Sequence, residues 1–440
     1  KRYYPYGTLA SKVLGFTGAD NQGILGLEVK YDEYLQGTNG KILTLTDARG
    51  IEIENAGESR LEPVNGYDLC LSLDYNIQMY CEQAAKKVCT KKSADSVSVI
   101  VMNPQNGELM AMVNYPEFDL NDPFTLVGDN GEAVSAEEKQ NLLNKMWRNQ
   151  CISDTYEPGS TFKPFTIAAA LDENIISGKS TFQCNGVKKV ADREIHCSNR
   201  NGHGMLDLRH ALMESCNAAL MDIGLGLGRN KFSKYNKLYG FGQRTGVDLP
   251  GETSGLIHTK EELNPVELAT SSFGQTQTVT MVQMLSGFSS LINGGNYYQP
   301  HLVKEIQNSN GDVVKTIDPV VVKRTTSEDT SSKLRSYLKS TVEEGTAAPA
   351  QVKGYSIGGK TGTAEKRPVS AKKYLVSFIG CEPAEDPEVA YYVIIDEPHV
   401  KDQAHSTYAT EFSSKVMKRV LPFLGQYASS SQIKQDAKQE

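Results

Sequence analysis

The sequence predicts an α+β fold: an antiparallel sheet flanked by helices, an all-helical region in the middle of the chain, and a smaller β-rich module at the N-terminal side. Short apolar segments typical of strands occur near residue 100 and again between residues 374 and 395. Between them, apolar residues recur at helical spacing. The 440 residues, 39% hydrophobic and 22% charged, suit one large domain with a smaller appendage.

The N-terminal sixty residues are rich in Gly and Asp and contain alternating apolar runs such as 41–46, which predict strands and hairpins. The elements expected next are strands, with one helix among them. We expect a strand at 68–74, a helix at 75–87, a buried strand at 96–102, a turn at 103–107 and a hairpin partner at 108–113.

Further along the chain, the predicted elements are helices first and strands later. We expect helices at 161–172, 208–225 and 280–292, strands at 374–380 and 389–395, and a closing amphipathic helix at 408–421. Residues 426–440 are polar and rich in Ser, Gln and Lys, which predicts a disordered tail. The predicted division is therefore 1–66, 67–425 and 426–440.

Composition restricts the partners of the chain. The net charge is −7 and no Lys/Arg run occurs, so we expect no nucleic-acid partner. No run of about 18 apolar residues occurs, so we expect neither a membrane span nor a signal peptide within the chain. Because the sequence starts at Lys1 without Met and with aromatic residues, we expect a membrane anchor upstream.

Three short motifs follow one another: Ser160-Thr-Phe-Lys163, Ser215-Cys-Asn217 and Lys360-Thr-Gly-Thr363. The first is weak alone, because other Ser-x-x-Lys strings occur in the chain. Lys-Thr-Gly occurs once, and only one Ser-x-Asn lies between it and an upstream Ser-x-x-Lys. Their order and spacing predict the active site of a serine acyltransferase.

Ser160 is the candidate nucleophile. Pro158 and Gly159 interrupt any earlier element, so we expect Ser160 to open a helix that continues to Ala170. A serine at a helix start is often only an N-cap. Lys163, however, is one helical turn away, where a partly buried amine of lowered pKa can remove the serine proton.

The other motifs supply polar groups. Apolar residues surround Ser215 and Asn217 in a predicted helix, so the pair is either solvent-exposed or part of a buried polar network. We expect Ser215 to relay a proton and Asn217 to bind a substrate amide.

Residues 356–364 predict a Gly-containing strand against which a ligand backbone fits. Here Lys360 supplies charge, Thr361 and Thr363 offer hydroxyls to a carboxylate, and Gly362 completes the substrate-binding set. A phosphate-binding loop over 354–361 is the alternative, but no helix signal follows it.

The eight cysteines fall into two groups. Five in apolar surroundings are predicted core residues: Cys70, Cys81, Cys89, Cys151 and Cys381. The others crowd, with one histidine, into a polar stretch and predict a structural zinc site: Cys184, Cys197, His203 and Cys216. His196 and Asp192 are substitute ligands, and a Cys184–Cys197 disulfide or free thiols are the alternatives. No motif for an organic cofactor occurs.

The three motifs and several further stretches make the chain resemble a class B penicillin-binding protein, a D,D-transpeptidase that cross-links peptidoglycan. The resemblance covers nearly the whole sequence. The further stretches are Gly26–Glu28 with Leu35 and Gly37, Pro104 with Gly107–Glu108, Glu157–Ser160, Tyr239–Gly242 with Asp248–Glu252, and Ser272–Gln275. The resemblance implies a penicillin-binding transpeptidase domain with a truncated N-terminal pedestal at 1–66. Some elongation-type relatives carry a metal site at matching spacing around 202–204.

The resemblance also implies a mechanism, partners and a location. Ser160 attacks the penultimate D-Ala of a stem peptide, Lys163 and Ser215 move protons, and the amides of Ser160 and Thr363 bind the oxyanion. An amine of a neighbouring stem peptide then resolves the acyl-enzyme. The implied partners are stem peptides, β-lactam antibiotics and a membrane glycosyltransferase. The implied location is the extracytoplasmic face of the membrane, in cell elongation, division or sporulation.

Two other functions stay open. A serine β-lactamase or β-lactam sensor shares the motifs. Residues 261–264 are similar to the loop that carries the deacylating Glu of class A enzymes, but Lys260 stands where that Glu is needed. The separation of Ser160 from Lys360 is also longer than in those enzymes. A non-catalytic scaffold that activates a glycosyltransferase is the second alternative, against which the intact motif residues argue.

Overall fold

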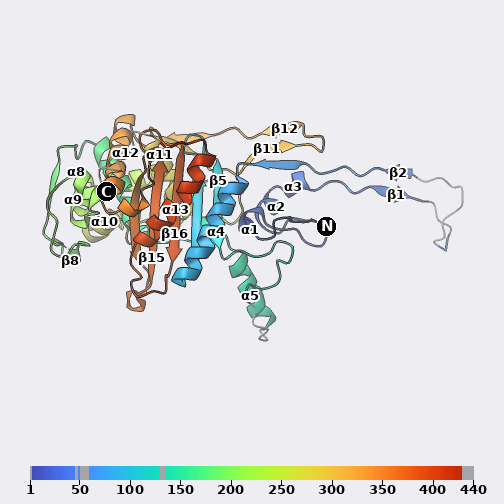
Figure 1. Cartoon of the computed structure of the whole chain (residues 1–440), viewed down its shortest axis with the longest axis horizontal. Coiled ribbons are helices and arrows are strands. Elements are labelled where there is room, and N and C mark those ends of the chain that lie inside the picture. Colours follow the sequence, from blue (N-terminus) through green and yellow to red (C-terminus); the bar gives the residue numbers. More distant parts are fainter. Residues whose placement is uncertain (1, 45–47, 50–58, 129–134, 429–440) are drawn as a thin grey trace.

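The structure is a computed structural model, and it describes residues 2–44, 48–49, 59–128 and 135–428 (Figure 1). Most of the predicted disordered tail lies outside the described residues, as does the end of the predicted strand 41–46. Within the described residues, no helix combines the length and apolar character needed to cross a membrane.

A five-stranded antiparallel sheet forms the centre of the molecule. Its order is β14 (Gly358–Glu365), β15 (Tyr374–Glu382), β16 (Val389–Asp396), β4 (Ser96–Met102) and β5 (Leu109–Tyr115). Every residue of β4 is buried, because its run of Val and Ile packs on both faces of the sheet. The predicted strands are confirmed with small shifts of their ends. The edge strand β14 pairs only with β15, so its other edge is free of any described strand.

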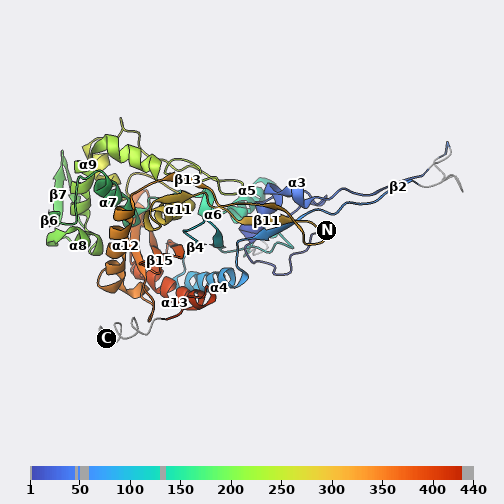
Figure 2. The same ribbon diagram turned by 90° about the horizontal axis from the view of Figure 1, so that it is seen from above.

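Helices cover both faces of this sheet (Figures 1 and 2). One face packs against α4 (Tyr75–Lys92) and α13 (Thr407–Phe423), whose apolar residues share a core cluster with the sheet. Asp74 caps α4 by accepting from two backbone amides of its first turn. The other face packs against α11 (Met281–Ile292), which is buried throughout and starts with a capping box between Thr280 and Gln283.

Elements of the helical region pack beside the edge strand β14, and Figure 2 shows this region at the end of the molecule opposite the N-terminus. Its elements are η1 (Gly159–Phe162), α7 (Lys163–Asp172), α8 (Leu208–Met213), α9 (Asn217–Leu238), α10 (Pro265–Ser271), α12 (Glu328–Glu343) and η2 (Ala348–Ala350). Three further elements are α5 (Ala136–Trp147) and α6 (Gln150–Ser153), which lie between β5 and η1 in the chain, and η3 (Val369–Ala371), which lies between β14 and β15. Small antiparallel pairs are β6 (Thr181–Cys184) with β9 (Gly204–Asp207), β7 (Val187–Val190) with β8 (Arg193–His196), and β10 (Asn296–Tyr298) with β13 (Val321–Arg324).

The predicted single helix at 208–225 is wrong, because two helices, α8 and α9, meet there. Ser215 lies between them with a left-handed backbone (φ 54°), which ends the helical hydrogen-bond pattern. The Cys216 side chain then caps α9 by accepting from the Ala219 amide. The second motif therefore occupies a break between helices, not a helix interior.

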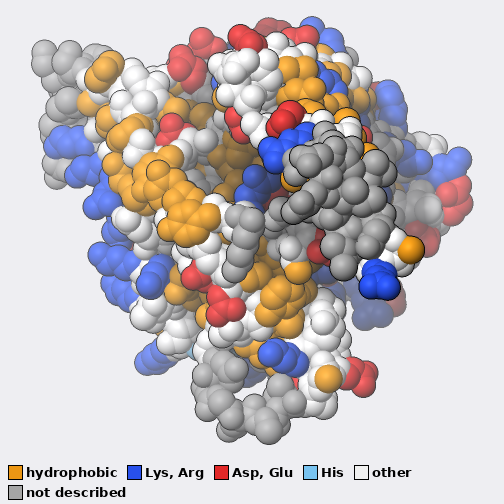
Figure 3. All heavy atoms as spheres, turned by 90° about the vertical axis from the view of Figure 1, so that its right-hand side faces the viewer, with side chains coloured by type: hydrophobic (Ala, Val, Ile, Leu, Met, Phe, Trp, Pro, Cys, Tyr) orange, Lys and Arg blue, Asp and Glu red, His pale blue; other side chains and the backbone are white. Residues whose placement is uncertain are grey.

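The N-terminal region differs in detail from the prediction. It contains three short helices, α1 (Ser11–Leu14), α2 (Gly26–Lys30) and α3 (Asp32–Leu35), besides the pair β1 (Lys41–Leu43) and β2 (Ser59–Leu61). Helices of four or five residues are too short to show a periodic pattern. The strand β3 (Asp68–Leu71) joins β11 (Val303–Gln307) and β12 (Val313–Thr316), which connects this region to the main domain. Figure 3 views this end of the molecule, where hydrophobic side chains lie between charged ones.

Candidate active site

Two glycines allow the turn that carries Ser160 to approach strand β14 closely. Gly159 has a left-handed backbone (φ 56°), and a Cβ there would lie 2.6 Å from the Thr363 carbonyl oxygen. A Cβ on Gly362 would lie 2.8 Å from Thr161 Cγ2. Both positions therefore exclude larger side chains. The first and third motifs pack directly against each other as a result.

Ser160 lies half-buried in the short 3₁₀ helix η1, and the α-helix α7 begins only at Lys163. The prediction that Ser160 opens an α-helix is therefore wrong in detail. The reason is the tight η1 turn, in which Lys163 N donates to the Ser160 carbonyl oxygen. No side-chain hydrogen bond caps the start of η1 or of α7.

The buried side chain of Lys163 joins the first motif to the second. Its ammonium donates to Ser215 Oγ at 3.0 Å, to Asn217 Oδ1 at 2.8 Å and to the Ser215 carbonyl oxygen. These three acceptors use all three donors of the ammonium. The expected hydrogen bond to Ser160 is not among them, so the lysine is held by the second motif.

Burial also changes the protonation of the two active-site lysines. Burial lowers the pKa of Lys163 to about 8, because the charged ammonium is removed from water. Burial, followed by the neighbouring Lys163 charge, lowers the pKa of Lys360 well below its ordinary value. Lys163 is therefore poised to exchange a proton near neutral pH.

Asn217 is fixed from both sides of its amide. Its Oδ1 accepts from Lys163, while its Nδ2 donates to the His196 carbonyl oxygen at 3.3 Å. The carbonyl lies at the end of β8, next to Cys197. The sequence indicates no role for this backbone group, because hydrogen bonds of main-chain carbonyls do not depend on residue type.

The third motif lies in the edge strand β14. Lys360 is fully buried, and its ammonium donates to the Thr361 carbonyl oxygen at 3.1 Å and to Thr361 Oγ1 at 3.3 Å. Thr363 Oγ1 donates to the Ala404 carbonyl oxygen at 3.2 Å. The structure thus brings Lys360 and both threonines to the strand that faces η1, with the Thr361 hydroxyl engaged by the lysine.

Sequence reasoning assigned no role to Gly274, which supports the nucleophile turn. Gly159 N donates to the Gly274 carbonyl oxygen at 2.9 Å. A Cβ on Gly274 would lie 2.1 Å from the Gly159 carbonyl oxygen. Within residues 272–275, the glycine itself is the only local indication that the backbone comes close to another segment.

The residues Cys184, Cys197, His203 and Cys216 converge in one cluster, with ligand atoms all within 4.8 Å of one another. His203 Nδ1 lies 3.4 Å from Cys184 Sγ and 3.6 Å from Cys197 Sγ, and Cys197 Sγ lies 3.9 Å from Cys216 Sγ. His196 and Asp192 do not belong to this cluster. The surrounding polar stretch 183–204 is organised by the short pairs β6–β9 and β7–β8.

The structure has no disulfide between the cysteines of this cluster. Hydrogen bonds from the Cys216 thiol and from backbone amides, including those of Asn217 and Ala218, lower the pKa of Cys197. Among the predicted core cysteines, four are buried: Cys81, Cys89, Cys151 and Cys381. Cys70 is exposed, because it alternates outward in β3.

Two protein-family models match the chain that carries this site. Residues 97–418 match the penicillin-binding protein transpeptidase domain, and residues 1–71 match the penicillin-binding protein dimerisation domain. The chain belongs to the penicillin-binding protein family. The fold prediction is thereby confirmed, since the central sheet, the helical region and all three motifs lie within the transpeptidase match.

Individual relatives agree with this assignment. The chain is 39% identical over 439 residues to "Stage V sporulation protein D" of Bacillus subtilis, which covers 98% of this chain and 65% of that protein. It is 30% identical to "Probable peptidoglycan D,D-transpeptidase PenA" of Neisseria meningitidis, which covers 96% of this chain and 68% of that protein. The chain therefore spans about two thirds of the length of these two relatives.

Solved structures of a penicillin-binding protein superpose on nearly all of the chain. Penicillin-binding protein 3 of Mycobacterium tuberculosis in its apo form has a TM-score of 0.82 at 25% identity, and covers 98% of this chain and 93% of that chain. The same protein has been solved in complexes with aztreonam and with ampicillin, with the same TM-score.

Proposed function

We propose that the chain is the catalytic part of a serine D,D-transpeptidase that cross-links peptidoglycan stem peptides and is acylated by β-lactams. The observation that carries the proposal is the buried Lys163 ammonium. This ammonium donates to both Ser215 Oγ and Asn217 Oδ1. Lys163 itself follows Ser160 by one helical turn, and the η1 turn that carries Ser160 packs against the strand that carries Lys360. This arrangement has a nucleophile, a base of lowered pKa and a proton relay, as acyl transfer requires.

In this proposal, Ser160 Oγ attacks the carbonyl carbon of the penultimate D-Ala and loses its proton to the neutral Lys163 amine. The amides of Ser160 and Thr363 stabilise the oxyanion. Ser215 Oγ, 3.0 Å from Lys163 Nζ, passes the proton to the departing amine of the terminal D-Ala. The amine of a second stem peptide then attacks the ester, the same groups return the proton, and the cross-link forms.

Asn217 and the third motif orient the peptide. Because the Asn217 amide is fixed between Lys163 and the His196 carbonyl oxygen, its orientation is defined before substrate arrives. Lys360 and Thr361 supply positive charge and a hydroxyl to the terminal carboxylate, and Gly362 leaves room for the peptide backbone. A β-lactam, which resembles the D-Ala-D-Ala terminus, forms an ester with the same serine.

A structural zinc ion belongs to the same proposal. A tetrahedral ion with Zn–S distances of about 2.3 Å places two sulfurs about 3.8 Å apart, and Cys197 and Cys216 are 3.9 Å apart. Three thiols and one imidazole form a common zinc donor set. Bound here, zinc would hold β6, β8 and β9 to Cys216, which lies between Ser215 and Asn217, and so fix the second motif.

We further propose that the protein acts at the extracytoplasmic face of a membrane, anchored by a helix outside this chain, beside a membrane glycosyltransferase. The exposed apolar side chains of β1 and β2 support a protein partner at the end shown in Figure 3, since Ile42, Leu43 and Leu61 are each more than half exposed. The sporulation name of the 39% identical relative favours a role in sporulation over elongation or division.

The test is the intact mass of the purified chain after incubation with benzylpenicillin, beside Ser160→Ala. We expect a long-lived adduct of one drug mass on the unsubstituted chain and none on the variant. Rapid drug hydrolysis without a lasting adduct would support the β-lactamase alternative. A folded chain that forms no adduct would support the scaffold alternative.

A further inference from the structure

A polar cluster joins the N-terminal region to the main domain, and none of its members belongs to the three catalytic motifs. Three consecutive N-terminal residues, Ala10, Ser11 and Lys12, are each at most 5% exposed. They contact two carboxyls of the main domain, those of Glu82 in α4 and of Glu117 after β5. The mechanism above leaves this cluster without a role.

Glu82 holds the first of these residues. Its Oε1 accepts from the Ala10 amide at 2.7 Å and from Gln78 Nε2 at 2.8 Å. Gln78 is buried and fixed, because its side chain also bonds to both polar backbone groups of Met112 in β5. Both bonds to Glu82 reach the same oxygen, so a proton on Oε2 leaves them intact.

Glu117 uses both of its carboxyl oxygens. Oε1 accepts from the Asn114 amide at 2.9 Å, and Oε2 accepts from the Ser11 hydroxyl. The Lys12 amide is a further donor, and the Lys12 ammonium is a neighbouring positive charge. Donors at both oxygens and a nearby cation favour the ionised form. Glu117 is therefore the carboxylate of the cluster, and Glu82 is the carboxyl that takes a proton.

The two carboxyls are close enough to repel each other when both are ionised. Burial, followed by the Glu117 charge, raises the pKa of Glu82 to about 7. Burial raises the pKa of Glu117 too, and Lys12 opposes that rise. The ammonium of Lys12 can offset one negative charge, but not two.

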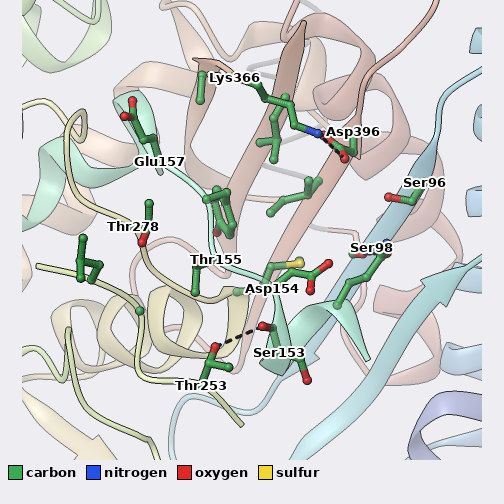
Figure 4. A pocket seen from close by; sticks show the side chains of 18 of the residues that line it. Ser96, Ser98, Ser153, Asp154, Thr155, Glu157, Thr253, Thr278, Lys366 and Asp396 are labelled. Atoms are coloured by element: carbon green, nitrogen blue, oxygen red, sulfur yellow. Dashed lines mark hydrogen bonds and ion pairs between the residues drawn. The ribbon is translucent and has the colours of Figure 1, made fainter. Parts of the chain in front are cut away.

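Further ionisable groups that adjoin the cluster are two thiols and one carboxyl, which add no positive charge. Burial raises the pKa of the Cys81 and Cys151 thiols, which therefore stay neutral. Asp154 also acts on the ammonium of the cluster, but it lines the cavity shown in Figure 4 and pairs with Arg148. Ionising Glu82 therefore adds a second buried negative charge against a single ammonium.

We propose that protonation of Glu82 controls the attachment of the N-terminal region to the main domain. While Glu82 is neutral, residues 10–12 are held at both carboxyls. When Glu82 ionises, its charge repels Glu117, and this segment separates more readily from α4.

The direction of the pH dependence follows from the raised pKa of Glu82. The attached segment keeps a proton that the separated segment releases. Attachment is therefore strongest at low pH, weakens as pH rises from the ordinary value of 4.5 to about 7, and is constant above that. This behaviour needs no acyl transfer, so its failure and the failure of the proposed function are distinguishable.

The test is hydrogen exchange of the purified chain by mass spectrometry between pH 5.5 and pH 8, with each rate corrected for its intrinsic pH dependence. We expect the protection factor of residues 9–15 to fall at least about tenfold over this range, because separation releases about one proton. We also expect this segment to exchange faster than β4 at every pH, as local opening requires. Constant protection of residues 9–15, or exchange no faster than that of β4, overturns the inference.

The matched variants are Glu82→Gln and Glu33→Gln, which remove the carboxyl of the cluster and an exposed carboxyl of α3. The amide oxygen of the first variant can accept the same two hydrogen bonds as Oε1. We expect Glu82→Gln to change protection by less than about twofold across the pH range, and Glu33→Gln to keep the tenfold fall. A fall that persists in Glu82→Gln overturns the inference.

Glu117→Gln is a second variant, which decides the question if Glu82→Gln does not fold. With Glu117 neutral, the Lys12 ammonium is left to pair with Glu82 and keeps it ionised. We expect the fall in protection of residues 9–15 to shrink to less than about threefold. A fall as large as that of the unsubstituted chain would show that the two carboxyls do not interact, and overturns the inference.

Discussion

Lys163 Nζ lies 2.8 Å from Asn217 Oδ1, although the two residues belong to different motifs and different helices. The same ammonium contacts Ser215, so the first two motifs form one buried network. Each polar group in it has a partner, which is the condition for burying a lysine without a carboxylate. Lys163 is thus shared between the nucleophile turn and the proton relay.

The first prediction concerns the pH dependence of Ser160 acylation. The base is the neutral amine, and burial lowers the pKa of Lys163 to about 8. The neutral fraction therefore rises about tenfold between pH 7 and pH 9 and then levels off. We expect the benzylpenicillin acylation rate to follow this rise, measured by stopped-flow or quenched mass spectrometry. A rate independent of pH between 6 and 9 would contradict the role of Lys163 as base.

The second prediction distinguishes the effect of a negative charge at position 217 from the effect of losing the hydrogen bond to Lys163. In Asn217→Asp a carboxylate replaces the amide oxygen beside Lys163, which stabilises the ammonium and raises its pKa by about 1–3 units. We expect the midpoint of the acylation profile to move above pH 9, with the rate at pH 7 at least about tenfold lower. The control is Asn217→Ala, which lowers the rate without an alkaline shift. An unchanged midpoint in Asn217→Asp would show that Lys163 is not the titrating group.

The sequence predicted the central sheet well, because β4, β15 and β16 are short, mostly apolar segments rich in Val, Ile and aromatic residues, as buried strands are. It also predicted which residues meet in the site, since motif order carries that information. It failed at Ser215, whose left-handed backbone breaks the expected helix. Apolar periodicity continues across this break, and the preference of Ser and Asn for caps and turns is too weak a signal to outweigh it.

Contacts made by the backbone were also beyond the sequence. The His196 carbonyl oxygen that fixes Asn217 depends on where β8 lies, not on the identity of residue 196. For the same reason, the sequence could not show that Lys163 bonds to Ser215 and Asn217 and not to Ser160. Both the η1 turn and the α8–α9 break arise from tertiary packing, which propensities do not report.

The third prediction tests the close approach of η1 to β14. Gly159→Ala adds a Cβ 2.6 Å from the Thr363 carbonyl oxygen, at a residue with φ 56°. The matched control, Gly311→Ala, has φ 86° but no heavy atom within 4 Å of the added Cβ. Both substitutions carry the backbone cost of about 1 kcal/mol, measured as the free energy of unfolding. Only Gly159→Ala is expected to slow acylation, by about 100-fold, because it displaces Ser160. Equal acylation rates of the two variants would contradict this packing.

The fourth prediction concerns the metal cluster. We expect about one zinc per purified chain by elemental analysis. Cys216→Ser is expected to reduce this stoichiometry to near zero and to lower the free energy of unfolding by about 2 kcal/mol or more, since a ligand bound only to the folded state stabilises it. The matched control is Cys70→Ser, at an exposed thiol outside the cluster, which should retain both the zinc and the stability.

Because Cys216 also caps α9 through its sulfur, loss of stability alone does not identify the metal. The decisive comparison is therefore Cys184→Ser, because the Cys184 sulfur does not cap α9. This variant must also lose zinc, and a metal-free chain with unaltered stability would overturn the site.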